Sequence, residues 1–242
     1  MKIIIILNSG RSGSSFLQSL FDKHPEVLQF PGEFLFNDKM MKIFNLASPN
    51  KFISSFVKLN NHFFDSRLNK FERHNKLGNS KKEYYKIDID KFKFFFLRSY
   101  EKSKKTNLEK LICLHTAYGE NNHKNKKKKI LLVNLHSVRY LKNYEKTLGI
   151  KSDKILLTLR DPLASFSSTI KNWQNYNNGV DLTPATLMLN IQNHFDHFNN
   201  LHFLRKKIKV VKLEKLHLHN KKILKKIFKF LNLSFSKVLL KS

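Results

Sequence analysis

The chain has 242 residues, with 46 Lys and Arg against 18 Asp and Glu, and therefore a formal net charge of +28. Its single cysteine excludes a disulfide framework and any cysteine-based zinc cluster. The apolar runs fall far short of the roughly 20 residues that a membrane-spanning helix needs, so we expect a cytoplasmic protein without a transmembrane segment.

The charge invites a nucleic-acid interpretation, because a basic surface attracts polyanions. However, 39 of the 46 basic residues are Lys, in a composition that is also rich in Asn, Ile and Phe and poor in Gly and Pro. An AT-rich genome imposes such a composition on any protein. We therefore expect no nucleic-acid partner from charge alone, and the many lysines have either a functional or a compositional origin.

Strands and helices alternate in the predicted structure. The chain begins with a buried strand at 3–7, a polar turn at 8–13, a helix at 14–23 and a short strand at 27–30. Residues 37–107 are mainly helical. The later predicted elements are a helix at 108–118, a strand at 130–133, a helix at 140–148, a strand at 155–159, a helix from 162, a helix at 183–204, a strand at 208–213 and a helix at 221–231.

This alternation predicts an α/β fold with a mainly parallel sheet, in which ligands bind at the carboxyl ends of the strands. The length suits one domain, 1–242, with a variable and mainly helical substrate-side region at about 37–125. The turn after the first strand and the segment that begins at Arg160 both lie at the predicted binding edge.

The first turn has the composition of a phosphate or sulfate cradle. Gly10 and Gly13 allow the backbone to turn tightly, and Arg11 adds a positive charge beside a helix start that favours anions. The hydroxyl donors of the turn are Ser12, Ser14 and Ser15. No Lys occurs from residue 3 to residue 18, so the turn is not the Lys-containing loop of ordinary ATP and GTP hydrolases.

Two segments here resemble a known family. Residues 10–17 read Gly-Arg-Ser-Gly-Ser-Ser-Phe-Leu, and residues 21–27 read Phe-Asp-Lys-His-Pro-Glu-Val before Glu33. They resemble the opening of sulfotransferases that use 3′-phosphoadenosine 5′-phosphosulfate (PAPS), of the carbohydrate and protein-tyrosine type. The resemblance implies a P-loop NTPase-like three-layer sandwich. It also implies that Arg11 contacts the transferring sulfuryl group and that Gly13, Ser14 and Ser15 hold the 5′-phosphate.

A second motif is independent of the first. Residues 156–168 read Leu-Leu-Thr-Leu-Arg-Asp-Pro-Leu-Ala-Ser-Phe-Ser-Ser. They are similar to the family's 3′-phosphate motif, in which a strand ends in Arg, usually before Asp-Pro, and a Ser follows eight residues later. Arg160 at a strand end can bind a phosphate with two hydrogen bonds, and Ser168 lies two helical turns on. The alternative is a surface pair of Arg160 with Asp161 at a helix start.

Sulfuryl transfer requires a base for the acceptor hydroxyl and positive groups for the leaving phosphate. Glu33 occupies the place where the resemblance implies a catalytic Glu. His136 follows the strand at 130–133, where the family often has Lys-Thr-Pro or, in other branches, Thr-His. We favour Glu33 as the base with His136 assisting. Arginine and backbone N–H groups can carry the charge, so we expect no metal.

The sequence therefore predicts a PAPS-dependent sulfotransferase that acts on a hydroxyl, with a carbohydrate as the expected acceptor. The alternatives are a P-loop-like small-molecule kinase and a basic nucleic-acid-binding module. The first turn lacks the Lys that a kinase would use. Oligomeric state and acceptor identity do not follow from the sequence.

Overall fold

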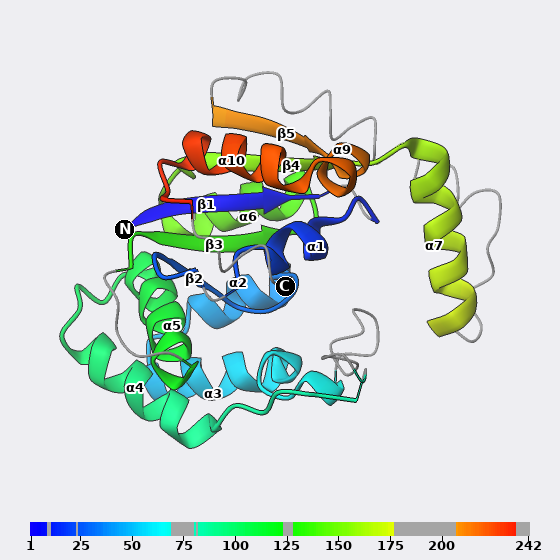
Figure 1. Cartoon of the computed structure of the whole chain (residues 1–242). Coiled ribbons are helices and arrows are strands. Elements are labelled where there is room, and N and C mark those ends of the chain that lie inside the picture. Colours follow the sequence, from blue (N-terminus) through cyan, green and yellow to red (C-terminus); the bar gives the residue numbers. More distant parts are fainter. Residues whose placement is uncertain are drawn as a thin grey trace.

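A five-stranded parallel sheet forms the centre of the computed structural model, which describes residues 1–8, 11–22, 24–68, 80, 82–122, 128–176 and 207–235. The strand order is β2-β3-β1-β4-β5, and every neighbouring pair is parallel (Figure 1). The strands are β1 (Lys2–Leu7), β2 (Val27–Gln29), β3 (Ile130–Leu135), β4 (Lys154–Leu159) and β5 (Ile208–Lys212). The predicted α/β fold with a parallel sheet is confirmed.

Both faces of the sheet are buried, which explains why its central strands are continuous apolar runs. In β1, Ile3 and Ile5 face one hydrophobic cluster, whereas Ile4 and Ile6 face another. Because successive side chains of a strand point to opposite faces, each cluster receives every second residue. The sheet is therefore held rigidly between two helical layers.

The helices divide between these two layers, as Figure 1 shows. On one face lie α1 (Ser14–Ser19), α9 (Leu213–Leu218) and α10 (Asn220–Leu231). The other face is covered by α2 (Asp38–Phe44), α3 (Pro49–Leu59), α4 (Ile89–Glu101), α5 (Asn107–Asn122) and α6 (Val138–Leu148). Helix α7 (Pro162–Tyr176) follows β4 and extends away from the sheet in Figure 1.

Two predicted boundaries were wrong for local reasons. The first helix ends at Ser19 rather than at residue 23, because the amides of Phe21 and Asp22 bond three residues back and tighten the chain into a turn. The last strand ends at Lys212, and Leu213 begins the short helix α9, which the sequence did not predict. Other boundaries agree within a few residues, and the predicted helix at 183–204 lies outside the described residues.

The region between β2 and β3 contains an aromatic core. Phe92 and Phe96 of α4 are buried, whereas Phe94 on the opposite face of that helix is exposed. Cys113 is buried in α5, and desolvation raises the pKa of its thiol to about 11, as expected for a packing residue. Within the described part of the chain, no helix has both the length and the apolar character needed to cross a membrane.

Candidate active site

The candidate residues gather at the carboxyl ends of β1, β3 and β4. Parallel strands place these ends on one edge of the sheet. Arg11 follows β1, His136 follows β3, and Arg160 follows β4. Glu33 lies in the segment after β2, and the amide of Phe34 donates to the carbonyl of Asn134 in β3 at 2.7 Å. The fold therefore brings residues from four separate parts of the sequence to one edge.

The loop between β1 and α1 depends on Gly13. This residue has φ of 85° in the left-handed region, and its carbonyl accepts the first backbone hydrogen bond of the helix, from Leu17, at 2.9 Å. A Cβ atom on Gly13 would lie 2.3 Å from Cδ1 of Leu213 in α9. A side chain at this position is thus disfavoured by the backbone conformation and requires the Leu213 side chain to move. Gly10 of the predicted cradle lies outside the described residues.

The three serines of the loop differ in their surroundings. Ser12 is buried, and its hydroxyl lies 2.8 Å from the hydroxyl of Thr158 in β4. Ser14 at the start of α1 is also buried, whereas Ser15 is half-buried. Because the Ser12 hydroxyl is engaged with Thr158, the backbone rather than the side chain of Ser12 is the group that this position can present to an anion.

Two guanidinium groups lie together beside this loop. Nε of Arg11 donates to Oγ of Ser168 in α7 at 3.3 Å. Nη1 of Arg160 donates to the carbonyl of Arg11 at 3.4 Å. Within the described residues, neither guanidinium forms an ion pair with a carboxylate. The structure therefore concentrates two positive charges and one hydroxyl where the sequence predicted a phosphate site.

The carboxylate of Asp161, next to Arg160, bonds to a backbone amide rather than to the arginine. Asp161 accepts a hydrogen bond from the amide of Ala164 at 2.9 Å and so caps α7. The amide of Asp161 in turn donates to Glu214 of α9 at 2.8 Å, and this bond holds the pKa of the Glu214 carboxyl below its ordinary value. The alternative of a surface Arg160–Asp161 pair does not occur in the structure.

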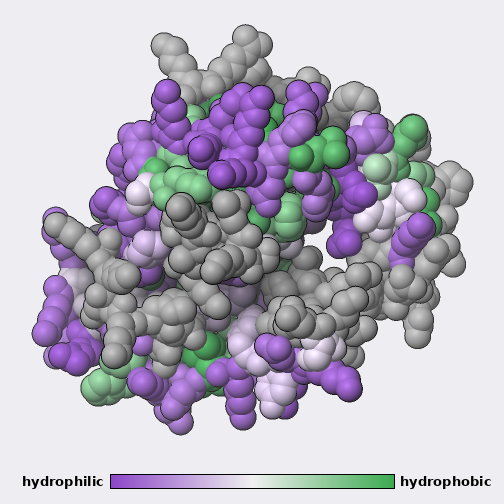
Figure 2. Space-filling model, viewed as in Figure 1, coloured by the Kyte–Doolittle hydropathy of each residue, from purple (hydrophilic) through white to green (hydrophobic). Residues whose placement is uncertain are grey.

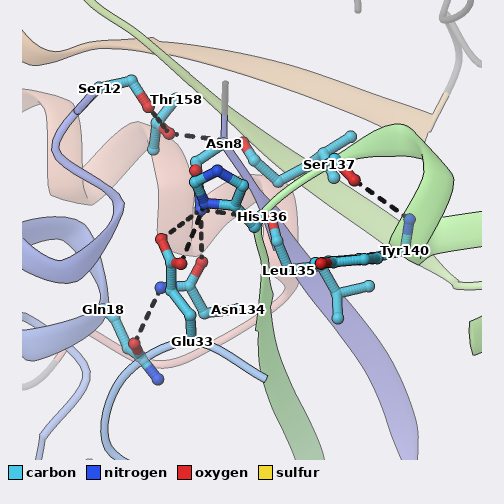
Figure 3. Close-up of polar contacts among 11 residues, drawn as sticks. Asn8, Ser12, Gln18, Glu33, Asn134, Leu135, His136, Ser137, Tyr140 and Thr158 are labelled. Carbon is cyan, nitrogen blue, oxygen red and sulfur yellow. Dashed lines mark hydrogen bonds and ion pairs between the residues drawn. The ribbon is translucent and has the colours of Figure 1, made fainter. Parts of the chain in front are cut away.

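A second polar cluster surrounds Glu33 (Figure 3). Nδ1 of His136 lies 3.0 Å from Oε2 of Glu33, and Nδ2 of Asn8 donates to Oε1 at 2.9 Å. Burial raises the pKa of this carboxyl, but the hydrogen bonds from His136 and Asn8 and the charges of His136 and Arg11 outweigh it. The net pKa is below the ordinary 4.5, so the carboxylate stays ionised near neutral pH.

The sequence reasoning missed the buried amides that hold this cluster. Asn134 donates to the side chain of Gln18 in α1 at 3.0 Å, and Asn8 donates to Asn134 at 3.2 Å. Gln18 donates to the carbonyl of Phe30 at 2.7 Å and so ties α1 to the segment before Glu33. An Asn near the end of the otherwise apolar run of β3 was the signal available, because buried amides must find partners.

These residues fit an anionic group such as a phosphate. The guanidinium groups of Arg11 and Arg160 are hydrogen-bond donors, and Ser168 adds a hydroxyl. In the described part of the chain, neither arginine is paired with a carboxylate. Oγ of Ser165, one helical turn before Ser168, is buried without a hydrogen-bond partner there. No cluster of His, Cys, Asp or Glu suited to a metal ion occurs among the residues that the structure describes.

Comparison with known proteins agrees with this chemistry. A family model described as the sulfotransferase family matches residues 4–237. A similar solved structure is the sulfotransferase domain of the olefin synthase from Synechococcus PCC 7002, with a TM-score of 0.60 and 17% identity. The alignment covers 99% of this chain and 76% of that domain's chain.

A second solved structure is the sulfotransferase domain of the curacin biosynthetic pathway. It has a TM-score of 0.50 and 15% identity, again covering 99% of this chain and 76% of the other. Likeness at this identity shows the shared fold, whereas the family match extends over nearly the whole sequence. No curated protein matches the chain.

Proposed function

This chain belongs to the PAPS-dependent sulfotransferase family, and we propose that it transfers the sulfuryl group of PAPS to a hydroxyl of a carbohydrate. The observation that carries the proposal is the meeting of Arg11, Arg160 and Ser168 at one edge of the sheet. Two separate sequence motifs supply these residues, and each fits one end of the nucleotide.

The nucleotide would be held at two places. Arg160 and Ser168 would bind the 3′-phosphate, because a guanidinium matches a phosphate with two charge-assisted hydrogen bonds. The loop from Gly10 to Ser15, with Arg11, would hold the 5′-phosphosulfate. Arg11 would connect the two binding places, since its guanidinium donates to Ser168 and its carbonyl accepts a hydrogen bond from Arg160.

The donor supplies a sulfuryl group whose bond to the 5′-phosphate breaks as the acceptor oxygen bonds to sulfur. The products are a sulfate ester, adenosine 3′,5′-bisphosphate and a proton. Arg11 would stabilise the charge that develops on the leaving phosphate, as preorganised cations do in related transfers. In this role Arg11 compensates for the Lys that the family often carries near His136.

The proton of the acceptor hydroxyl would pass to the Glu33–His136 pair. Both carboxylate oxygens of Glu33 accept hydrogen bonds and its pKa is lowered, so Glu33 is a weak base. An imidazole has an ordinary pKa near 6.5, and one held by a carboxylate at Nδ1 suits general-base work. We assign proton acceptance to His136 and its orientation to Glu33, which exchanges the roles favoured from the sequence.

The acceptor class rests on the carbohydrate-type resemblance of the opening motif. The test is transfer of radiolabelled sulfate from PAPS, with EDTA present, to a panel of oligosaccharides, phenols and tyrosine peptides. We expect labelled oligosaccharide as the main product, and loss of transfer in Arg11→Ala but not in Arg98→Ala, which changes an exposed arginine of α4. Label on phenols or peptides alone would overturn the acceptor, and a Mg²⁺-dependent phosphate transfer from ATP would overturn the reaction.

A further inference from the structure

One polar side chain interrupts the apolar run of β4. Thr158 lies two residues before Arg160 and is 2% exposed. Its hydroxyl is 2.8 Å from the hydroxyl of Ser12 and donates to the carbonyl of Leu7 at 3.4 Å. If Thr158 donates to Leu7, then Ser12 is the donor to Thr158, because each hydroxyl has one proton. Both hydroxyl groups therefore donate their protons to hydrogen bonds within the protein.

The hydroxyl pair begins where the backbone pairing of β1 and β4 ends. The register of these strands runs from Ile4 opposite Lys154 to Leu7 opposite Leu157. Thr158 is the next residue of β4, whereas the chain after Leu7 turns into the loop. The Ser12–Thr158 contact thus extends the junction of the two strands to the loop that leads into α1. Figure 3 shows the two side chains pointing toward each other.

The contacts between this loop and the segment that carries Arg160 include Arg11 to Ser168, Arg160 to the carbonyl of Arg11 and Ser12 to Thr158, and these contacts differ in exposure. Arg11 to Ser168 and Arg160 to the carbonyl of Arg11 are exposed and long, at 3.3 and 3.4 Å. Such bonds are weak, and both use the guanidinium groups that an anion would attract. The Ser12–Thr158 bond is short and buried. A buried polar pair is costly to break because neither partner can turn to water.

We propose that Thr158 is a positioning residue that couples the two phosphate-binding halves of the site. Its hydroxyl fixes Ser12, and thereby the loop that carries Arg11, relative to Arg160, which directly follows the strand that contains Thr158. A nucleotide with two phosphate groups binds at two subsites at once. The second phosphate gains affinity only when the distance between the two subsites matches the distance between the phosphates. This inference rests on the proposed nucleotide site.

The experiment replaces the hydroxyl without changing the shape of the side chain. Calorimetry measures the binding of adenosine 3′,5′-bisphosphate and of adenosine 5′-monophosphate to Thr158→Val, Thr158→Ser and the wild type. We expect Thr158→Val to lose about tenfold in affinity for the bisphosphate, the cost of one buried hydrogen bond, and clearly less for the monophosphate. Thr158→Ser, which keeps the hydroxyl, restores the wild-type affinity.

Two further variants keep the test sharp. Ser12→Ala removes the other end of the bond, so it should have the same effect as Thr158→Val, and the double variant should lose no more than either single variant. Thr147→Val in α6 is the matched control, since its buried hydroxyl has no partner among the described residues. Its nucleotide affinity should remain that of the wild type. If Thr158→Val does not fold, Ser12→Ala carries the test.

Three outcomes would overturn the inference. Wild-type affinity in Thr158→Val or Ser12→Ala, with Arg160→Ala weakened, removes the coupling but leaves the proposed function intact. An equal loss in Thr147→Val shows that general destabilisation explains the effect. If the wild-type protein binds neither nucleotide, the proposed function fails and Thr158 has no ligand to position.

Discussion

At the scale of single residues, Glu33 illustrates how neighbours decide what a carboxylate can do. Asn8 and His136 donate to its two oxygens, and Arg11 adds a nearby positive charge. These groups favour the ionised form and hold the pKa of the carboxyl below 4.5. The residue is thereby better suited to hold an imidazole than to accept a proton from a hydroxyl.

With His136 as the base and Glu33 as its partner, the dependence of kcat on pH can be predicted. The pKa of the Glu33 carboxyl lies below 4.5, so a loss of kcat as the pH falls within the range above 4.5 would belong to protonation of His136 rather than of Glu33. In Glu33→Gln the amide no longer stabilises the imidazolium, so the acid limb moves to lower pH and kcat drops by about tenfold or more. The measurement is kcat against pH for both proteins.

A contrary profile has a clear meaning. If the wild-type acid limb lies below pH 4.5, and His136→Ala keeps it there with high activity, then Glu33 itself is the base. Retention of full turnover in both Glu33→Gln and His136→Ala would remove the pair from the mechanism.

The sequence pointed to the charged residues of the candidate site but not to the neutral side chains around them. Arg11 and Arg160 were identified from motifs at strand ends, and the structure places both at one edge of the sheet. The bond from Ser12 to Thr158 was missed, because no local pattern tells which distant hydroxyl a buried serine will meet. Long-range pairing of neutral polar groups is decided by strand register, which the sequence does not state.

At the scale of elements, the loop that leads into α1 is fixed by contacts from α9 as well as by its own backbone. Gly13 adopts φ of 85°, and the side chain of Leu213 occupies the space beside it. Gly149 offers a comparison, since it has φ of 66° at the end of α6, but no described residue beyond its neighbours in the chain has an atom within 4 Å of the position that a Cβ would take there. Both glycines have a positive φ, but Gly13 precedes α1 and meets the side chain of Leu213, whereas Gly149 ends α6 without such a contact.

This difference predicts unequal costs for alanine. Gly149→Ala should lower the free energy of unfolding by about 1–2 kcal/mol, the cost of a left-handed alanine. Gly13→Ala should cost about 1–3 kcal/mol more, because Leu213 must be displaced. The second change Leu213→Ala should recover part of the excess in denaturant unfolding. Equal costs for the two glycines would show that the contact with α9 is unimportant.

The elements themselves were predicted well where an apolar pattern was continuous. The apolar runs predicted the ends of β1, β3 and β4 to within two residues, and Gly149 correctly indicated the end of α6. The end of α1 and the presence of α9 were not predicted. In both places the local sequence pattern fits either conformation, so a boundary there is not decided by the pattern.

At the scale of the whole molecule, the net charge of +28 acquires a more limited meaning. Figure 2 shows hydrophilic side chains over α10, which lies on the same face of the sheet as α1. The exposed lysines of α10 are Lys221, Lys222, Lys225, Lys226 and Lys229. A positive surface of this kind accelerates the approach of any small anion without adding a specific contact.

The charge therefore predicts a kinetic effect of salt. Raising the ionic strength from about 0.05 to 0.5 M shortens the screening length, so the association rate constant of adenosine 3′,5′-bisphosphate should fall severalfold. Its dissociation rate constant should change much less, because the bound contacts are short. Stopped-flow binding gives both constants, with neutral adenosine as the control ligand. An association rate that ignores salt would show that the lysines do not steer the donor.

The central claim is that Arg160 recognises the 3′-phosphate of a nucleotide. Calorimetry of adenosine 3′,5′-bisphosphate and adenosine 5′-monophosphate with the wild type, Arg160→Ala and the surface control Arg98→Ala tests it most directly. A charge-assisted bond worth about 1.5–3 kcal/mol predicts at least about tenfold weaker bisphosphate binding in Arg160→Ala, little change for the monophosphate, and no change in Arg98→Ala. Equal bisphosphate affinity in the wild type and Arg160→Ala would contradict the account.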